Sequence, residues 1–374
     1  MPRQRTKRPK ADFAGGVSNL RGAIYYRWIG GVLLGRFRRG SGRDLKASKS
    51  AGPARGRTTT LWRHCDIGRR EGILSVKPNF FIVGAPKCGT TALYEYLRPH
   101  PSIFMPEIKE PHFFARDLGT YPRIKTLEEY TGLFAASRAE HLRLGEASVY
   151  YLRSSVAIPN IRAFNPDAKV IAMFRNPVDM VYSLHGQLLY VSEETEGDFE
   201  TAWRMQERRS RGIDVPPRIR SPLLVQYAQV GQFGTQTERL LACFPRSQVK
   251  LILYDDFAAS PQQVYDEVIE FLEIPHDQRS AFPRINESKR TRSAWLRKFS
   301  RKPPPVLHNA FRSLKQAVGG ELIGAVKEKI VALNTVKESR PPLSPAFRAE
   351  LVESFREEVA LLSRLLNRDL THWV

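Results

Sequence analysis

The chain has 374 residues, 42% of them hydrophobic, and a formal net charge of +21 at pH 7. This length suffices for one large domain or two smaller ones with a sizeable buried core. Its three cysteines, Cys65, Cys88 and Cys243, form neither a CxxC pair nor a Cys/His cluster with zinc spacing. This pattern argues against a disulfide framework and a structural zinc site, and a reduced compartment is the simplest interpretation.

Most of the positive charge lies at the amino-terminal end. Residues 1–77 contain 19 lysines and arginines against four acidic residues and show no sustained hydrophobic period. We therefore predict a basic, mostly disordered segment over 1–77 and a folded domain over 78–374. The apolar stretch 23–35 is shorter than the ~20 residues that span a bilayer, and no convincing cleavage site follows it. We expect a cytoplasmic protein, and leave open whether residues 1–77 contact anionic membrane or form a partly ordered tail.

The first motif of the domain lies between a predicted strand at 80–83 and a helical pattern at 92–97. The intervening residues, 84–91, form a glycine-bounded loop in which backbone N–H groups and a helix amino end can face an anion. The spacing Gly84-x4-Gly89 matches the nucleotide-binding loop G-x-x-x-x-G-K-[ST]. However, Thr90 occupies the lysine position, and the only lysine is Lys87. The loop therefore suits a phosphate-like group other than the βγ-phosphates of a magnesium nucleotide.

Strand and helix patterns alternate through the rest of the domain. The continuous apolar run at 169–174 predicts a strand buried on both faces, and Pro177 suits the first turn of the next helix. The last helix is predicted to begin at Ser344 and Pro345. Together these patterns predict an α/β fold, a P-loop-like three-layer domain with a central parallel sheet flanked by helices. Further helices are predicted over 128–136, 227–244 and 261–272, further strands over 146–152 and 249–254, and a loop with partial helix over 284–320.

A second motif follows the strand at 169–174, where Arg175 is followed eight residues later by Ser183. This pair and the loop around Lys87 resemble the nucleotide motifs of sulfotransferases that use 3′-phosphoadenosine 5′-phosphosulfate (PAPS). Between the two motifs, the run 109–114 (Lys-Glu-Pro-His-Phe-Phe) resembles the segment that carries the catalytic base in the carbohydrate-type branch. The resemblance covers roughly residues 78–374 and implies PAPS as cofactor, with 3′-phosphoadenosine 5′-phosphate (PAP) as product and no metal requirement.

The resemblance implies a role for each residue of the two motifs. Lys87 would contact the 5′-phosphosulfate and stabilise the leaving oxygen, while Arg175 and Ser183 would bind the 3′-phosphate. Cys88 is interpreted chiefly as a small residue that fits the turn. The remaining expected nucleotide contacts are Cys88, Gly89, Thr90 and Thr91 in the loop, and Tyr227, Lys289 and Arg290 further along the chain.

Glu110 is the predicted general base. Its apolar neighbours Pro111, Phe113 and Phe114 are expected to desolvate it and raise its pKa toward working pH. The rival is His112, whose ordinary pKa also suits the role. Lys109 is a second candidate contact for the sulfate.

The resulting hypothesis is in-line transfer of a sulfuryl group to a hydroxyl or amine of a carbohydrate or glycolipid. The charged, proline-containing residues 192–222 are predicted to lie over the acceptor site. One alternative is a P-loop kinase-like enzyme, for which residues 251–256 could be a magnesium-binding strand, although Thr90 argues against it. The other is a binder of nucleic acid or anionic membrane driven by residues 1–77. For the enzyme itself, no specific nucleic acid is expected.

Overall fold

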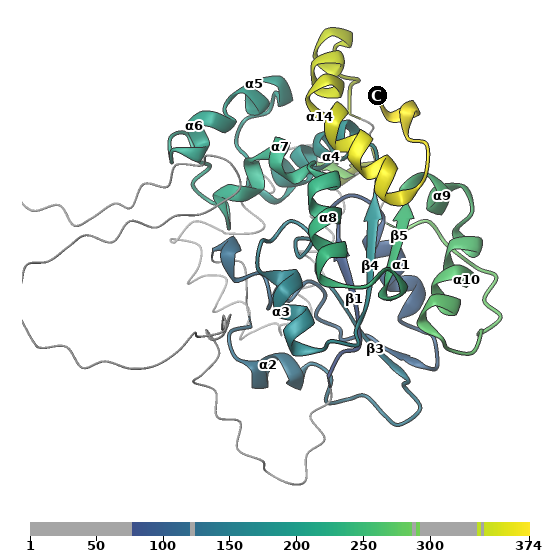
Figure 1. Ribbon diagram of the computed structural model, residues 1–374. Coiled ribbons are helices and arrows are strands. Elements are labelled where there is room, and N and C mark those ends of the chain that lie inside the picture. Colours follow the sequence, from purple (N-terminus) through teal and green to yellow (C-terminus); the bar gives the residue numbers. More distant parts are fainter. Residues whose placement is uncertain (1–76, 120–123, 286–288, 292–334, 338–339) are drawn as a thin grey trace, which may run out of the picture. The chain divides into compact units, whose positions relative to one another are not determined.

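A computed structural model describes residues 77–119, 124–285, 289–291, 335–337 and 340–374 (Figure 1). Five strands form one sheet in the order β2-β3-β1-β4-β5, and every pairing in it is parallel. The strands are β1 (Phe80–Gly84), β2 (Ile103–Phe104), β3 (Arg143–Ala147), β4 (Lys169–Phe174) and β5 (Val249–Leu253). The predicted α/β fold with a central parallel sheet is confirmed.

Strand β1 is the centre of the sheet and of the core. Its residue Phe81 pairs with Glu146 of β3 on one side and with Val170 of β4 on the other. All five residues of β1 are buried, as are the last five of β4. This burial on both faces explains why these two strands have continuous apolar sequences rather than alternating ones.

Helices cover the sheet in two groups, which lie on either side of the strands in Figure 1. In one group, α3 and α14 pack against α8. In the other, α1 meets α9 through Tyr96 and Phe257, whose ring centroids are 5.8 Å apart. Among the described residues, no helix combines the length and apolar character that crossing a membrane requires. The helices are α1 (Thr90–Leu97), α2 (Leu127–Gly132), α3 (Ala157–Phe164), α4 (Pro177–Val191), α5 (Phe199–Arg204), α6 (Gln206–Ser210), α7 (Tyr227–Val230), α8 (Phe233–Cys243), α9 (Tyr254–Ala259), α10 (Pro261–Leu272) and α14 (Pro345–Leu366).

The prediction of a single helix over 227–244 is wrong, because this part of the chain forms two helices, α7 and α8, which are separated at Gly231. A Cβ atom on Gly231 would lie 2.4 Å from the ring of Phe355 on α14, and one on Gly234 would lie 2.6 Å from the carbonyl oxygen of Glu358. The two glycines therefore let α14 approach closely. This contact lies more than a hundred residues away in sequence, so the local pattern could not reveal it.

Two other predicted boundaries also shift. The strand predicted over 146–152 is β3, which begins at Arg143 and ends at Ala147. After it, the amide of Tyr151 donates to the carbonyl of Ser148, so the chain turns instead of continuing. The helix predicted over 128–136 is the shorter α2, which starts with a capping box between Thr126 and Glu129.

The predictions for α4, α10 and α14 are confirmed. Each begins with its proline at the first turn, and the Ser344 side chain caps α14 by accepting from the amide of Phe347. The apolar stripe of α14 faces the core. Its members Phe347, Leu351, Phe355 and Leu362 are buried, and Leu366 is partly buried.

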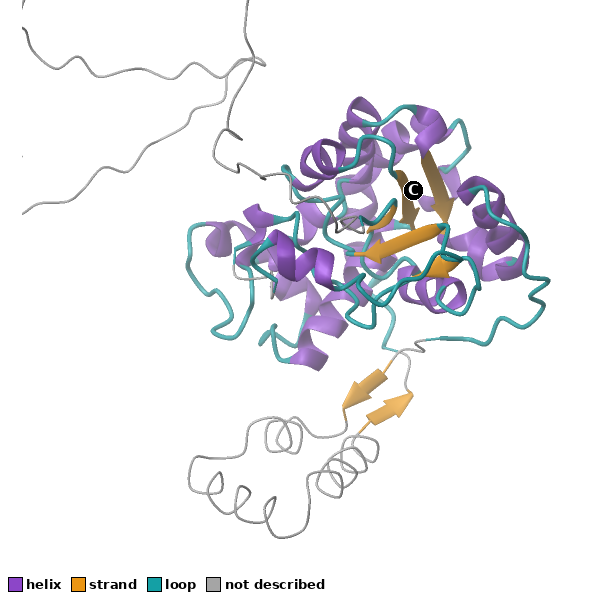
Figure 2. Ribbon diagram, turned by 90° about the horizontal axis from the view of Figure 1, so that it is seen from below, coloured by secondary structure: helices purple, strands orange, loops and turns teal. Residues whose placement is uncertain are grey.

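A second, two-stranded sheet pairs β6 (Lys289–Thr291) with β7 (Thr335–Lys337) in antiparallel register (Figure 2). The backbone of β6 lies beside α4. Most of the loop predicted over 284–320 falls outside the described residues, as does the predicted basic segment apart from Lys77.

Candidate active site

The predicted site residues meet at the carboxyl edge of the sheet, where β3, β1 and β4 end side by side. The loop 85–89 leaves β1, and Arg175 directly follows β4. Glu110 is tied to the end of β3, because its amide donates to the carbonyl oxygen of Ala147 over 3.0 Å. In parallel sheets, ligands bind at this edge where neighbouring strands send their connections in opposite directions.

The charges of these residues influence one another directly. Burial lowers the pKa of the Lys87 ammonium most, and the positive charge of Arg175 lowers it further. The negative charge of Glu110 acts in the opposite sense on the same group. Lys87 therefore lies within electrostatic reach of both Arg175 and Glu110, between the two ends of the candidate site.

The loop after β1 leads into α1 through a left-handed glycine. Gly89 has φ +91°, and a Cβ atom there would lie 3.1–3.3 Å from side-chain atoms of Phe257, Tyr254 and Met173. Only a glycine combines this backbone conformation with this packing. Within the described residues no side chain caps the amino end of α1, so its first N–H groups, at Thr90 and Thr91, are suited to an anion.

Cys88 lies within this loop but is wholly buried. Its thiol donates to the carbonyl oxygen of Pro86 over 3.3 Å, and burial raises its pKa. The side chain thus fills the turn as a protonated thiol, which agrees with its interpretation as a small residue. Any contact of Cys88 with a ligand would use its backbone.

Arg175 lies at the opposite side of Lys87 from Glu110 in strand order. Its guanidinium lies 4.9 Å from the ring centroid of Tyr254, which holds the side chain over an aromatic face. Asn176 caps α4 by accepting from the amide of Val178, and Ser183 lies further along the same helix, half-buried. Strand β6 lies beside α4, so the backbones of Lys289 and Arg290 approach the predicted 3′-phosphate side, while their side chains fall outside the described part of the chain.

Of the two candidates for the general base, Glu110 is the one that solvent reaches. Its side chain is 33% exposed, whereas that of His112 is wholly buried. The Nε2 atom of His112 lies 3.6 Å from one carboxylate oxygen, and the ammonium of Lys109 lies 2.7 Å from the other. An acceptor in solution can reach Glu110 but not His112, so the geometry favours Glu110 as the base.

The expected upward shift in the pKa of Glu110 is wrong. Burial does act to raise it, but hydrogen bonding to His112 and the charge of Lys109 outweigh burial and lower the pKa to about 2. The apolar neighbours in the sequence suggested only the first of these effects. With this lowered pKa, Glu110 is an ionised carboxylate at every physiological pH.

Comparisons with known proteins identify the family of this chain. A family model described as a sulfotransferase domain matches residues 77–306. The chain therefore belongs to the sulfotransferase domain family. The crystal structure of a sulfotransferase from Alicyclobacillus acidocaldarius is 30% identical, with a TM-score of 0.58, and the match covers 79% of this chain and 98% of that one.

Two relatives in this family carry carbohydrate names. Carbohydrate sulfotransferase 15 of Rattus norvegicus is 26% identical over 268 residues, covering 57% of this chain and 47% of the relative. The bifunctional heparan sulfate N-deacetylase/N-sulfotransferase 4 of Mus musculus is 32% identical over 221 residues, covering 57% and 24%. The match thus spans less than half the length of either relative.

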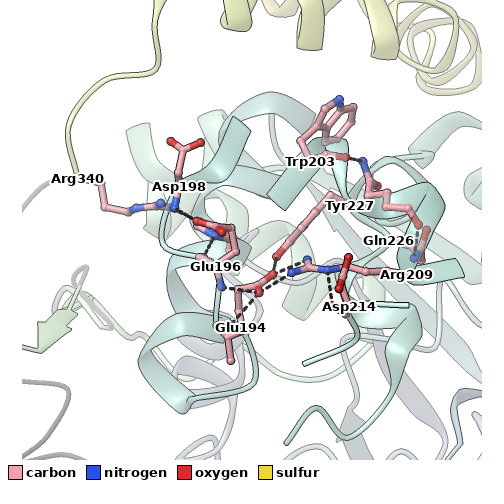
Figure 3. A network of polar contacts seen from close by, with 12 residues as sticks. Glu194, Glu196, Asp198, Trp203, Arg209, Asp214, Gln226, Tyr227 and Arg340 are labelled. Atoms are coloured by element: carbon pink, nitrogen blue, oxygen red, sulfur yellow. Dashed lines mark hydrogen bonds and ion pairs between the residues drawn. The ribbon is translucent and has the colours of Figure 1, made fainter. Parts of the chain in front are cut away.

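Tyr227, predicted as a nucleotide contact, belongs to a network of polar contacts with Glu194 and Arg209 (Figure 3). Its side chain is wholly buried, and its hydroxyl donates to a carboxylate oxygen of Glu194 over 2.7 Å. The guanidinium of Arg209 donates to both oxygens of the same carboxylate, at 2.7 and 2.8 Å. Through these contacts Tyr227 joins α7 to the segment 192–222.

That segment also brings a cation toward the candidate base. Arg220 forms an ion pair with Glu193 at 2.5 Å and is 43% exposed. Burial lowers the pKa of His112 most, and Glu110 acts to raise it. The positive charges of Lys109 and then Arg220 lower it further. Arg220 was not identified from the sequence, because its closeness to His112 depends on the folding of residues 192–222.

Asp255 and Asp256, the two acidic residues after β5, are engaged in hydrogen bonds within the chain. Asp256 accepts two hydrogen bonds from the guanidinium of Arg368, at 2.6 and 2.7 Å. Asp255 accepts from the indole of Trp373 over 2.8 Å. Both acids therefore fasten the C-terminal residues, which explains their presence without a magnesium ion.

Proposed function

We propose that this chain is a PAPS-dependent sulfotransferase acting on a carbohydrate acceptor. The observation that carries the proposal is the meeting of Lys87, Arg175 and Glu110 at one edge of the sheet, with the uncapped amino end of α1 beside them. A loop lysine and a helix amino end suit a phosphosulfate, and an arginine further along the same edge suits a second phosphate.

The residues divide the reaction between them. PAPS supplies the activated sulfuryl group, and the loop 85–91 would hold its phosphosulfate while Arg175 and Ser183 would hold its 3′-phosphate. Glu110 would take the proton of the acceptor hydroxyl, whose oxygen bonds to sulfur as the sulfur–oxygen bond to the phosphate breaks. Lys87 would stabilise the negative charge that grows on that phosphate oxygen.

Lys109 would regulate the strength of the base. In the unliganded site it pairs with Glu110 and, together with His112, lowers the pKa of that carboxylate against the effect of burial. If Lys109 turned to a sulfuryl oxygen, Glu110 would lose this ion pair while remaining partly buried. Its pKa would then rise, and the carboxylate would become a stronger base when substrate is present.

The carbohydrate acceptor is inferred from the named relatives and from the Lys-Glu-Pro-His-Phe-Phe segment at 109–114. In this segment the exposed Glu110, rather than the buried histidine, faces the site. Arg220, whose charge acts on the neighbouring His112, would provide a positive charge on the acceptor side.

The direct test is calorimetric titration of PAP into the full chain, with Lys87→Ala and Arg175→Ala alongside and ATP–Mg as competitor. We expect PAP to bind the wild type, each variant to bind at least tenfold more weakly, and ATP–Mg to compete poorly. Lys77→Ala is the matched control, because Lys77 is an exposed lysine just before β1. No PAP binding, or preferred binding of ATP–Mg, would reject the proposal in favour of a kinase-like enzyme.

A further inference from the structure

Beneath the candidate base lies a second glutamate that the reaction scheme does not use. Glu146 of β3 is wholly buried, and no basic side chain among the described residues forms an ion pair with it. Instead, three hydroxyl groups donate to its carboxylate. The hydroxyl of Ser148 binds one oxygen, while the hydroxyls of Tyr130 and Tyr151 bind the other over 2.9 and 3.0 Å.

Two of these three hydroxyls also bind the backbone of the segment that carries Glu110. The oxygen of Ser148 accepts from the amide of His112 over 3.0 Å, and the oxygen of Tyr151 accepts from the amide of Phe114 over 3.3 Å. A hydroxyl has one hydrogen, so donating it to Glu146 leaves its oxygen lone pairs for these amides. An ionised Glu146 therefore sets the direction of both bridging hydroxyls.

The segment above needs such support because its backbone is strained. Glu110 has φ +61° and His112 has φ +51°, a left-handed conformation that is unfavourable for non-glycine residues. Conformations of this kind persist only where surrounding contacts fix them. Here the contacts are the amide of Glu110 on Ala147 and the two hydroxyl bridges.

We propose that Glu146 is a positioning residue, which holds the segment 109–114 in its strained conformation by orienting the hydroxyls of Ser148 and Tyr151. It acts through these hydroxyls and does not itself touch the acceptor. The importance of this for catalysis rests on the proposed role of Glu110 as base.

Tyr130 and Tyr151 provide a matched pair of variants. Both are wholly buried, and both donate to the same oxygen of Glu146 at nearly the same distance. Only Tyr151 continues to the backbone of the segment, through the amide of Phe114. Tyr151→Phe and Tyr130→Phe therefore each delete one buried hydrogen bond from a hydroxyl to Glu146. Only Tyr151→Phe also deletes the hydrogen bond that the amide of Phe114 donates to that hydroxyl.

The experiment is amide hydrogen exchange at pH 8, where the carboxylate form of Glu146 predominates, on the full chain and on Tyr151→Phe, Tyr130→Phe and Glu146→Gln. We expect exchange at His112 and Phe114 to become about tenfold faster in Glu146→Gln, since one hydrogen bond is worth roughly a factor of ten. In Tyr151→Phe the same acceleration should appear at Phe114. Tyr130→Phe should leave both amides unchanged relative to Val268 of α10, which serves as internal reference.

Equal acceleration in all three variants, shared by Val268, would show only a loss of global stability and would overturn the inference. Unchanged exchange in Tyr151→Phe and Glu146→Gln would overturn it as well. PAP titration of the same samples separates this result from the proposed function. Failure of the wild type to bind PAP rejects that function, while the exchange data still decide whether Glu146 positions the segment.

Discussion

Two glutamates, Glu110 and Glu146, lie at the end of the same strand pair and have opposite electrostatic environments. Glu110 is one-third exposed and touches a lysine, and its pKa falls to about 2. Glu146 is wholly buried among hydroxyls, and burial raises its pKa to about 7 despite three hydrogen bonds. The three hydroxyl hydrogen bonds thus offset only part of the effect of burial on the pKa of Glu146, whereas the hydrogen bond with His112 and the charge of Lys109 together outweigh it at Glu110.

A third glutamate, Glu194, shows that deep burial alone does not decide the direction of the pKa shift. The Glu194 carboxylate is as deeply buried as that of Glu146, yet its pKa is lowered. Burial acts to raise that pKa, but the paired guanidinium of Arg209 outweighs it. The two buried carboxylates thus have different partners: Glu194 forms an ion pair, while Glu146 accepts hydrogen bonds from hydroxyl groups and has a raised pKa.

The largest expected effect is the loss of transfer activity in Glu110→Gln. Removing a general base costs roughly 10²–10⁴-fold in rate, and the amide cannot take a proton from the acceptor. Affinity for PAP should stay within about threefold of the wild type, because no nucleotide-binding residue changes. The measurement is release of PAP from PAPS with a glycan acceptor. Glu107→Gln is the control, since Glu107 is an exposed glutamate three residues earlier, and a similar loss in that variant would contradict the assignment.

Next in size is the stability loss in Arg209→Leu, which leaves the charge of Glu194 buried without its ion-pair partner. Breaking a buried pair from one side costs about 3–5 kcal/mol. The double variant Arg209→Leu/Glu194→Leu should recover much of this free energy of unfolding, because no buried charge is then left unpaired. Urea denaturation of the full chain measures both values. A single variant as stable as the wild type would show that the pair is not buried in solution.

Glu146 should make stability depend on pH in the opposite sense from Glu110. Because its folded pKa of about 7 lies above the unfolded value of 4.5, its contribution is full below pH 4.5 and disappears as pH rises to 7. The corresponding loss is roughly 2–4 kcal/mol, and Glu146→Gln should remove it. Glu110, with its lowered pKa, contributes above pH 4.5 and loses its contribution as pH falls toward 2. Urea midpoints measured from pH 4.5 to 8 for wild type and Glu146→Gln check this difference.

The smallest expected effect is on the pKa of Glu110 in Lys109→Gln. Burial raises this pKa and Lys109 is one of the groups that lower it, so removing its charge should raise the pKa by about 1 unit. Carbon-13 NMR of the side-chain carboxyl measures the change. An unaltered pKa would assign the whole lowering to His112 and would remove the proposed role of Lys109 in tuning the base.

The sequence sufficed to predict the edge of the sheet that carries Lys87 and Arg175. Arg175 directly follows an apolar run that predicts a buried strand, and Lys87 lies three residues after the end of β1, so their position depends on local pattern and on the rules of βα topology. The resemblance of its segment predicts Glu110 as the base, which stays a prediction, but the lowered pKa of Glu110 could not be predicted. Whether the side chain of Lys109 turns toward Glu110 depends on the left-handed backbone of the segment, which no local pattern indicates.

Residues of the buried polar clusters could not be assigned from the sequence. The hydrogen bonds that bury Tyr227 could not be predicted, because its partners Glu194 and Arg209 lie 33 and 18 residues away in sequence and are charged, as surface residues usually are. Glu146 receives hydroxyls from α2 and from the turn after β3, two elements whose contact becomes visible only in the folded chain.

The contrast between the two glutamates is tested most directly by carbon-13 NMR titration of the glutamate carboxyls from pH 3 to 9. Glu110→Gln and Glu146→Gln assign the two resonances. We predict that the resonance lost in Glu146→Gln titrates near pH 7, while the resonance lost in Glu110→Gln remains that of a carboxylate down to about pH 3. Two resonances titrating together near 4.5, or Glu110 titrating near 7, would contradict this account of the site.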